Sequence, residues 1–179
     1  TVAGMNHTHH PNPLQNMTAA LFRPVDAAFL TLFRIVFGVV VMVFVVKMLA
    51  SGAVAGLYIA PTSHFHYAGF EWVRPWPGSG MYIHFMVMGV LALLVTVGLF
   101  YRAASVALAA SFTYMFLLDR SYYLNHYYLM CLLCWMMAIL PAHCQLSFDA
   151  LGKRGVASAV VPAWTLWLVR FHIALPYFF

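Results

Sequence analysis

Long apolar runs are the feature that most limits how this chain can fold. The first run, residues 27–50, contains only two charged side chains, Arg34 and Lys47. At a rise of about 1.5 Å per residue it reaches roughly 36 Å, enough to cross a bilayer with some tilt. Four further runs have the same character: residues 81–100, 103–118, 124–140 and 162 onward. The sequence therefore predicts an all-α integral membrane protein, a multi-pass helical bundle with about five transmembrane helices and no β-sheet.

Charge and composition indicate which kind of partner, lipid or nucleic acid, this chain can bind. Only 7% of the 179 residues are charged and 64% are hydrophobic, whereas a soluble domain carries about 25% charged residues. The formal net charge of +5 is modest and no basic stripe accompanies it. We therefore expect a lipid bilayer with anionic headgroups as a partner, and no nucleic acid.

Two segments lie outside the apolar runs. Residues 1–21 are polar and lack the charged and apolar regions of a secretory signal, so we expect a flexible N-terminal tail. Residues 51–80 are rich in glycine, proline and aromatic residues, which predicts a loop on the membrane surface or a lid over the bundle. This loop contains His64-x-His66. No third ligand stands at a usual metal-site spacing, so we expect no metal and favour a surface or quinone-facing role for the two histidines.

Basic residues in the loops predict the orientation of the chain. One side of the membrane would carry Arg23, Arg102, Lys153 and Arg154, and the other Lys47, Arg74 and Arg120. Four against three favours a cytoplasmic N-terminus. Asn125-His126 and the aromatic loop would then lie together on the far side, which favours one shared site there.

The stretch 116–129 gathers polar groups between two apolar runs: Asp119, Arg120, Asn125, His126 and four tyrosines. Lipid offers such groups no hydrogen bonds, so the cluster is costly unless it pairs or has a function. If a helix begins near Ser121 as its N-cap, Tyr122 and His126 lie on one face. One interpretation is a polar helix start at the interface, with tyrosines in the aromatic belt. The other is that Asn125 and His126 point into the bundle and handle a substrate.

Basic side chains at membrane depth form a second candidate group: Arg34, His84, His126, Arg170 and His172. Arg34 and Arg170 each lie about 12 Å along their runs, and their depths would match if the two helices ran in opposite directions. An arginine in a span costs on the order of 3 kcal/mol, so it either reaches the surface or faces the bundle. A basic, poorly solvated pocket favours an anion such as a quinolate or a carboxylate.

The motif L-D-R-S-x-x-x-N-H-x-Y-L, from Leu118 to Leu129, resembles a motif of the vitamin K-dependent gamma-glutamyl carboxylases. It is equally similar to that of their bacterial relatives, the horizontally transferred transmembrane (HTTM) domain proteins. Further segments match in the same order: Phe22-Arg23-Pro24-Val25-Asp26, Phe33-Arg34-Ile35-x-Phe37-Gly38, Phe70-Glu71-Trp72-Val73, Gly98-Leu99-x-Tyr101-Arg102, Ser147-x-Asp149-Ala150-Leu151 and Leu168-x-Arg170-Phe171. The resemblance covers nearly everything from Phe22 to Phe179, and the order and spacing of the segments make it specific.

The resemblance implies an HTTM-like domain over residues 22–179 in a bacterial inner membrane protein. In the family, vitamin K hydroquinone reacts with O2, a peptide glutamate loses a γ-proton, CO2 adds, and the quinone leaves as its epoxide. The cofactor would thus be vitamin K hydroquinone, and a partner would be a glutamate-containing peptide or protein. The resemblance places the family's functional pair on Asn125 and His126, which we expect to be catalytic. For cofactor binding we expect four residues: Arg34, Tyr122, Arg170 and His172.

The family's catalytic base is a lysine that follows, after a few residues, the motif matched by Tyr177-Phe178. The sequence begins with Thr1 and ends at Phe179 within an apolar run, which predicts a fragment of a longer protein. We therefore expect these residues alone to turn over no vitamin K and the complete protein to do so.

Other classes remain open alternatives. One is a quinone-binding, transport or structural membrane module without carboxylase activity. Another is a haem protein, since several histidines lie in or near the spans. A membrane di-iron desaturase is excluded, because its histidine boxes do not occur in the sequence.

Overall fold

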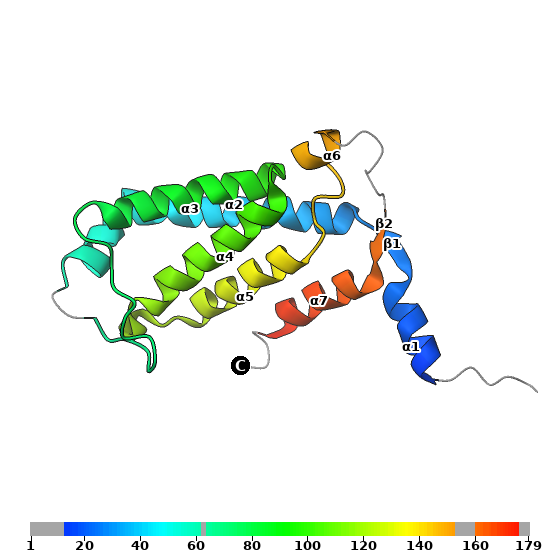
Figure 1. Ribbon diagram of the computed structural model, residues 1–179, viewed down its shortest axis with the longest axis horizontal. Coiled ribbons are helices and arrows are strands. Elements are labelled where there is room, and N and C mark those ends of the chain that lie inside the picture. The colour runs from blue at the N-terminus through cyan, green and yellow to red at the C-terminus, as the bar shows by residue number, and fades with distance from the viewer. Residues whose placement is uncertain (1–12, 62–63, 153–159, 176–179) are drawn as a thin grey trace, which may run out of the picture.

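The computed structural model describes residues 13–61, 64–152 and 160–175. Within these residues the chain is mostly helical, as the apolar runs predict. Five helices form the body of the protein: α2 (Ala28–Ala50), α3 (Gly80–Val97), α4 (Tyr101–Leu117), α5 (Asn125–Ile139) and α7 (Ala163–Ala174). They run back and forth along the long axis, and each of α2 to α5 packs against the next while α7 packs against α5 (Figure 1).

The remaining elements are short and lie at the ends of this bundle. They are α1 (Pro13–Phe22), β1 (Pro24–Asp26), a π-helix (Ala55–Ile59), a 3-10 helix (Arg120–Tyr122), α6 (Phe148–Gly152) and β2 (Val160–Pro162). The π-helix and the 3-10 helix lie at one end, and α1, α6 and both strands lie at the other (Figure 1).

Each of the five predicted spans is a helix, with boundaries that agree to within a few residues. Among the described residues, α2 and α3 are long and apolar enough to cross a membrane, and α5 is a shorter apolar helix. The long apolar runs therefore predicted the helices correctly, and two of these are candidate membrane spans by length and composition.

The prediction of no β-sheet is wrong at one place. β1 and β2 pair antiparallel, with Val25 opposite Val161. Each strand includes a proline: Pro24 begins β1, directly after Arg23, and Pro162 ends β2, directly after Val161. A residue before proline is driven out of the helical region into an extended conformation. Strands of three residues are too short to show an alternating hydrophobic pattern. The prolines are the only feature of the sequence that indicates extended backbone at these two places.

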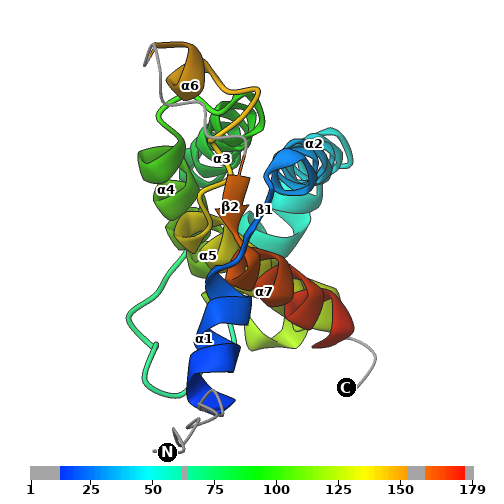
Figure 2. The same ribbon diagram turned by 90° about the vertical axis from the view of Figure 1, so that its right-hand side faces the viewer.

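The small sheet fixes the direction of two helices. β1 leads into α2 and β2 leads into α7, so both helices begin at the same end of the bundle (Figure 2). Arg34 and Arg170 therefore lie at similar distances from that end because the helices start together. The match in depth therefore does not require the two helices to run in opposite directions.

The predicted flexible tail is partly helical. Pro13 occupies the first position of α1, where its missing N–H is not needed, and the apolar residues that follow favour the helix. The Ala163 N–H donates to the carbonyl of Arg23 at 2.9 Å, which ties this segment to the start of α7. Residues 1–12 lie outside the described part of the chain.

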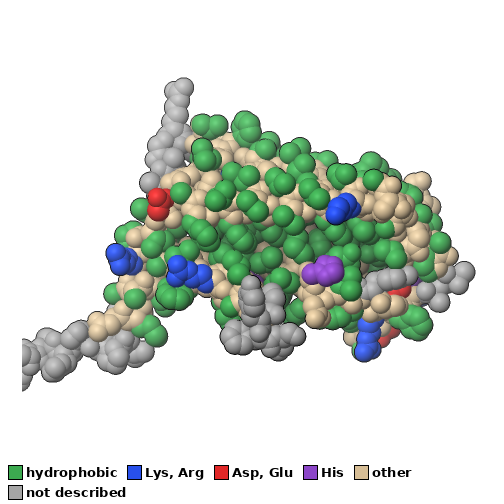
Figure 3. Space-filling model, turned by 180° about the vertical axis from the view of Figure 1, so that it is seen from behind, with side chains coloured by type: hydrophobic (Ala, Val, Ile, Leu, Met, Phe, Trp, Pro, Cys, Tyr) green, Lys and Arg blue, Asp and Glu red, His purple; other side chains and the backbone are tan. Residues whose placement is uncertain are grey.

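The outer surface of the bundle is apolar over its length. Exposed side chains on α2 and α3 include Val36, Val39, Val43, Val46, Ile83, Met86, Val87 and Val90. Figure 3 shows hydrophobic atoms over most of one face, with the few charged side chains mainly toward the ends. Water would not favour such a surface, whereas lipid chains suit it, so the surface agrees with a membrane protein.

Candidate functional site

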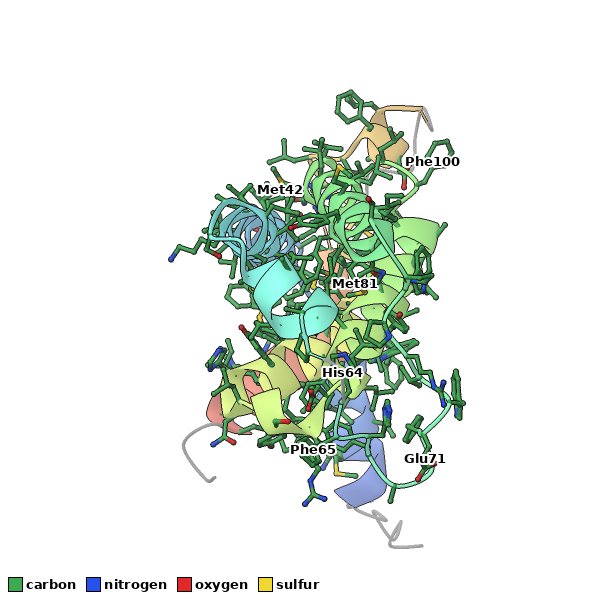
Figure 4. All side chains as sticks on the ribbon, turned by 90° about the vertical axis from the view of Figure 1, so that its left-hand side faces the viewer. Met42, His64, Phe65, Glu71, Met81 and Phe100 are labelled. Carbon is green, nitrogen blue, oxygen red and sulfur yellow. The ribbon has the colours of Figure 1, made fainter. Side chains whose placement is uncertain are left out.

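The aromatic loop 61–79 and the polar hairpin at residues 118–124 meet at one end of the bundle. The His64 Nδ1 lies 3.1 Å from Asp119 Oδ2, and both side chains are nearly buried. Beside this pair the Arg120 N–H donates to the carbonyl of Phe65 at 2.7 Å. Figure 4 views this end, with His64 near the centre of the molecule and Glu71 at the outer edge of the loop. The aromatic loop therefore contacts the polar stretch through Asp119 and Arg120, which precede Asn125 and His126 in the chain.

Two further contacts hold the loop against α4. The Tyr67 ring stacks on Phe116, with centroids 5.6 Å apart. The Tyr114 hydroxyl donates to the carbonyl of Arg74 at 2.7 Å. The loop is therefore fixed near both of its ends, at His64–Tyr67 and at Arg74.

Asp119 anchors the hairpin. Its Oδ1 accepts hydrogen bonds from both the backbone N–H and the hydroxyl of Ser121. Burial opposes ionisation, but the hydrogen bonds from Ser121 and His64 outweigh it and hold the pKa of Asp119 below its ordinary value. The carboxylate is therefore charged at neutral pH, and the tie to His64 weakens only as pH falls through this lowered pKa.

The predicted N-cap at Ser121 is wrong. Asp119 caps the 3-10 helix Arg120–Tyr122, and α5 begins only at Asn125. The carboxylate of Asp119 accepts the hydrogen bond of the Ser121 N–H, which stabilises a short 3-10 turn at the point where α5 was expected to begin. The chain therefore makes this turn before α5 starts. Tyr122 and His126 thus belong to different helices. The side chain of Tyr122 lies outside what the structure describes.

Beside the His64–Asp119 pair lies a cavity of about 490 Å³. Its lining is Tyr58, Ile59, His64, His66, Arg74, Pro75, Trp76, Pro77 and Gly78. The volume falls within the range of about 300–1,000 Å³ that is usual for small-molecule sites. Aromatic and proline side chains supply flat apolar walls, and the polar side chains are those of Tyr58, His64, His66 and Arg74. None of the lining residues in the described part of the chain is acidic, so the cavity suits a flat ligand with an anionic or acceptor oxygen.

Two polar atoms of the loop are buried without a partner among the described residues, His66 Nδ1 and the Tyr67 hydroxyl. Leaving such an atom unpaired costs about 1–3 kcal/mol. His66 lines the cavity, so a ligand oxygen there would give its nitrogen a hydrogen bond. Burial raises the pKa of Tyr67, so that hydroxyl keeps its proton.

A buried histidine on α3, His84, contacts the lining residue Trp76. The His84 ring lies 5.0 Å from the Tyr114 ring and 5.9 Å from the Trp76 ring, measured between centroids. Its Nε2 lies 3.3 Å from the Ser111 hydroxyl oxygen. His84 therefore positions Trp76 by ring contacts.

Asn125 and His126 lie at the first two positions of α5. Both side chains are exposed, and the His126 ring contacts Tyr127 edge to face. They lie at the same end of the bundle as the cavity but do not line it.

Arg34 lies toward the other end of the bundle and is fully buried. Its guanidinium donates to the carbonyls of Ala142 at 3.1 Å and Leu146 at 2.6 Å. Of the two alternatives for an arginine within a span, Arg34 therefore takes the second and faces the bundle interior. Its contacts tie the α5–α6 connection to α2 and do not reach the cavity.

Asp149 makes a second tie at the Arg34 end. Its carboxylate accepts from the N–H groups of Phe100 and Tyr101 at 2.9 and 2.8 Å, so α6 caps the start of α4. The two ties together make this end of the protein a tightly hydrogen-bonded structural region.

Arg170 and His172 both lie on α7. Arg170 is exposed, with its guanidinium 5.3 Å from the centre of the Trp167 ring. His172 Nδ1 lies 2.9 Å from the Leu168 carbonyl oxygen. The basic residues expected at membrane depth thus have separate partners and do not form one pocket.

A family model for the HTTM domain matches residues 22–179. The chain belongs to the HTTM domain family. This domain is that of the vitamin K-dependent carboxylase family, as the motifs indicated. No solved structure matches the chain.

The HTTM match includes the whole cavity and the Asn125-His126 pair. Sequence reasoning singled out the aromatic loop and His64-x-His66 but missed the partner of His64, because Asp119 is 55 residues away. It also missed Arg74 and Trp76 as lining residues. The density of aromatic residues around them was the signal that pointed to this loop.

Proposed function

We propose that this HTTM protein is a vitamin K-dependent gamma-carboxylase-like membrane protein. It couples epoxidation of vitamin K hydroquinone to carboxylation of peptide glutamate, and the cavity beneath the aromatic loop takes the hydroquinone. The observation that carries the proposal is the cavity of about 490 Å³, with aromatic walls and basic polar groups, inside the family-matched region.

The lining residues fit a reduced naphthoquinone. Trp76 and the neighbouring prolines offer flat apolar contact to the ring system. His66 has a buried nitrogen without a described partner, and Arg74 offers a cation for an oxygen that loses its proton. When bound, the cofactor together with O2 supplies the base strength that removes a γ-proton from glutamate, and CO2 adds to that carbon.

Asn125 and His126 have a separate task in this proposal. They are exposed at the cavity end of the bundle, where a peptide reaches them from outside. An amide and a neutral imidazole bind and polarise a carboxylate without adding a buried charge. We assign them to the glutamyl substrate. The cofactor role predicted for Arg34, Tyr122, Arg170 and His172 stays a prediction.

The proposal includes five spanning helices in a bacterial inner membrane, with the N-terminus in the cytoplasm. The loop charges support this orientation, in which the cavity would lie on the outer side of the membrane. A cysteine introduced at Arg120 is then labelled from the outside, and one at Arg102 from the cytoplasm. Labelling of both from the same side contradicts the orientation.

Naphthoquinone binding tests the cavity directly. Quinones quench tryptophan fluorescence, so binding to the protein in detergent micelles is expected to lower the emission of Trp76. Trp76→Ala removes one aromatic wall and is expected to weaken binding by up to about tenfold, since an aromatic pair contributes about 0.5–1.5 kcal/mol. Binding is measured by competition with a labelled naphthoquinone.

The matched control is Trp167→Ala, because Trp167 is equally exposed but lies on α7 beside Arg170. That variant is expected to keep the affinity of the natural chain. A loss of affinity in the Trp167 variant but not in the Trp76 variant places the ligand elsewhere. The non-enzymatic alternative, a quinone-binding module, predicts the same binding but no carboxylation by any form of the protein.

A further inference from the structure

His64 and Asp119 form a side-chain pair that joins two distant parts of the chain. Their Nδ1–Oδ2 distance is 3.1 Å, and the side chains are 10% and 4% exposed. The neighbouring hydrogen bond from the Arg120 N–H to the carbonyl of Phe65 fixes the two backbones relative to each other. The position of His64 beside Asp119 therefore depends on this backbone hydrogen bond as well as on the contact between the two side chains.

The pair also fixes which nitrogen of His64 faces a ligand. Asp119 Oδ1 accepts two hydrogen bonds from Ser121, which keeps the carboxylate ionised. An ionised carboxylate only accepts, so Nδ1 of His64 carries the proton and donates it. In the tautomer that donates from Nδ1, Nε2 carries the lone pair, and His64 lines the cavity. An aspartate that fixes the tautomer of a histidine in this way prepares it to accept a proton.

Asp119 is the acidic group that stabilises a protonated His64. The other charged or titratable groups near the pair are basic or phenolic: His66, Arg74 and Tyr58 line the same cavity, and Arg120 adjoins Asp119 in the chain. The other carboxylate of the loop, Glu71, is exposed and accepts from the Gly69 N–H. Arg74 therefore supplies the positive charge for an oxyanion formed on a ligand in the cavity. Asp119 supplies the negative charge that stabilises a protonated His64.

We propose that His64, positioned by Asp119, accepts the proton of an acidic hydroxyl group on a ligand in this cavity. The O–H bond of the ligand breaks and an N–H bond forms at Nε2. The electron pair stays on the ligand oxygen as an oxyanion beside Arg74, and the imidazolium is stabilised by Asp119. This inference rests on the proposed quinone site, and it is independent of the lysine that the family resemblance implies.

The test uses hydroxynaphthoquinone, whose visible absorbance changes when its hydroxyl ionises, bound to the full chain in detergent. Methoxynaphthoquinone has no hydroxyl group that can ionise, so it measures only whether the cavity binds a naphthoquinone. The bound hydroxyl is expected to ionise about one pH unit or more below its value in empty micelles. In His64→Gln and Asp119→Asn this shift is lost while methoxynaphthoquinone still binds. Glu71→Gln, the matched control in the same loop, keeps the full shift.

Nitrogen NMR of labelled histidine gives a readout without any ligand. His64 is expected to carry its proton on Nδ1 in the natural chain, and Asp119→Asn is expected to lose this preference. If methoxynaphthoquinone binds but the hydroxyl shift survives in His64→Gln, the proton-acceptor inference is overturned and the quinone site stands. If neither probe binds to the natural chain, both the site and this inference are wrong.

Discussion

Replacing Arg34 with methionine is expected to lower the free energy of unfolding by about 3 kcal/mol. The guanidinium is fully buried and donates to the carbonyls of Ala142 and Leu146. Methionine fills a similar length but leaves the buried carbonyl of Ala142 and the partly buried carbonyl contact at Leu146 without their donor, and an unpaired buried group costs about 1–3 kcal/mol before relaxation. Unfolding in detergent, followed by circular dichroism against added denaturant, measures the change.

Arg34→Lys is expected to lose most of the same stability, because one ammonium cannot reproduce the planar fork that reaches two carbonyls. Arg170→Lys is the matched control. Arg170 is exposed and contacts Trp167 only through a cation–π interaction, so this change is expected to cost less than about 1 kcal/mol. Equal stability of the Arg34→Lys and natural proteins would show that the buried guanidinium is not a structural clamp.

His126→Ala is expected to lower kcat/KM for peptide carboxylation about a hundredfold, which is typical for loss of a positioned acid–base or polarising group. Its side chain is exposed at the start of α5, so stability and naphthoquinone binding are expected to stay unchanged. The measurement is incorporation of labelled CO2 into a glutamate peptide by the complete protein, with hydroquinone supplied.

Tyr128→Phe serves as the control for His126, since Tyr128 is an exposed neighbour on the same helix and keeps its ring contacts with Phe116. We expect it to retain activity. If His126→Ala reduces only the yield of folded protein, with normal kcat/KM in what remains, His126 is a packing residue at the interface and not a catalytic one.

Most of the helical architecture was predictable from the sequence, because lipid requires long uninterrupted apolar runs and α2 and α3 have them. The β1–β2 pairing was not predictable. Its strands contain three residues each, and backbone pairing at Val25 and Val161 leaves no periodic pattern. The prediction that α5 begins near Ser121 is wrong because the Ser121 N–H donates to the carboxylate of Asp119.

The candidate site was predictable only in part. The aromatic loop was expected on the membrane surface or as a lid over the bundle, and the structure places it against the polar hairpin. The partners of Arg34 could not be inferred, because main-chain carbonyls such as that of Ala142 have no signature in sequence. The His64–Asp119 pair depends on how two loops 55 residues apart come together, which hydrophobic patterns do not specify.

A photoreactive naphthoquinone, crosslinked to the protein and mapped by peptide mass spectrometry, tests the central claim most directly. The account predicts labels on the lining segments, residues 58–66 and 74–78, that excess unlabelled naphthoquinone removes. Competable labels on α7 near Arg170 and His172, or around Arg34, with none on the lining segments, would contradict it.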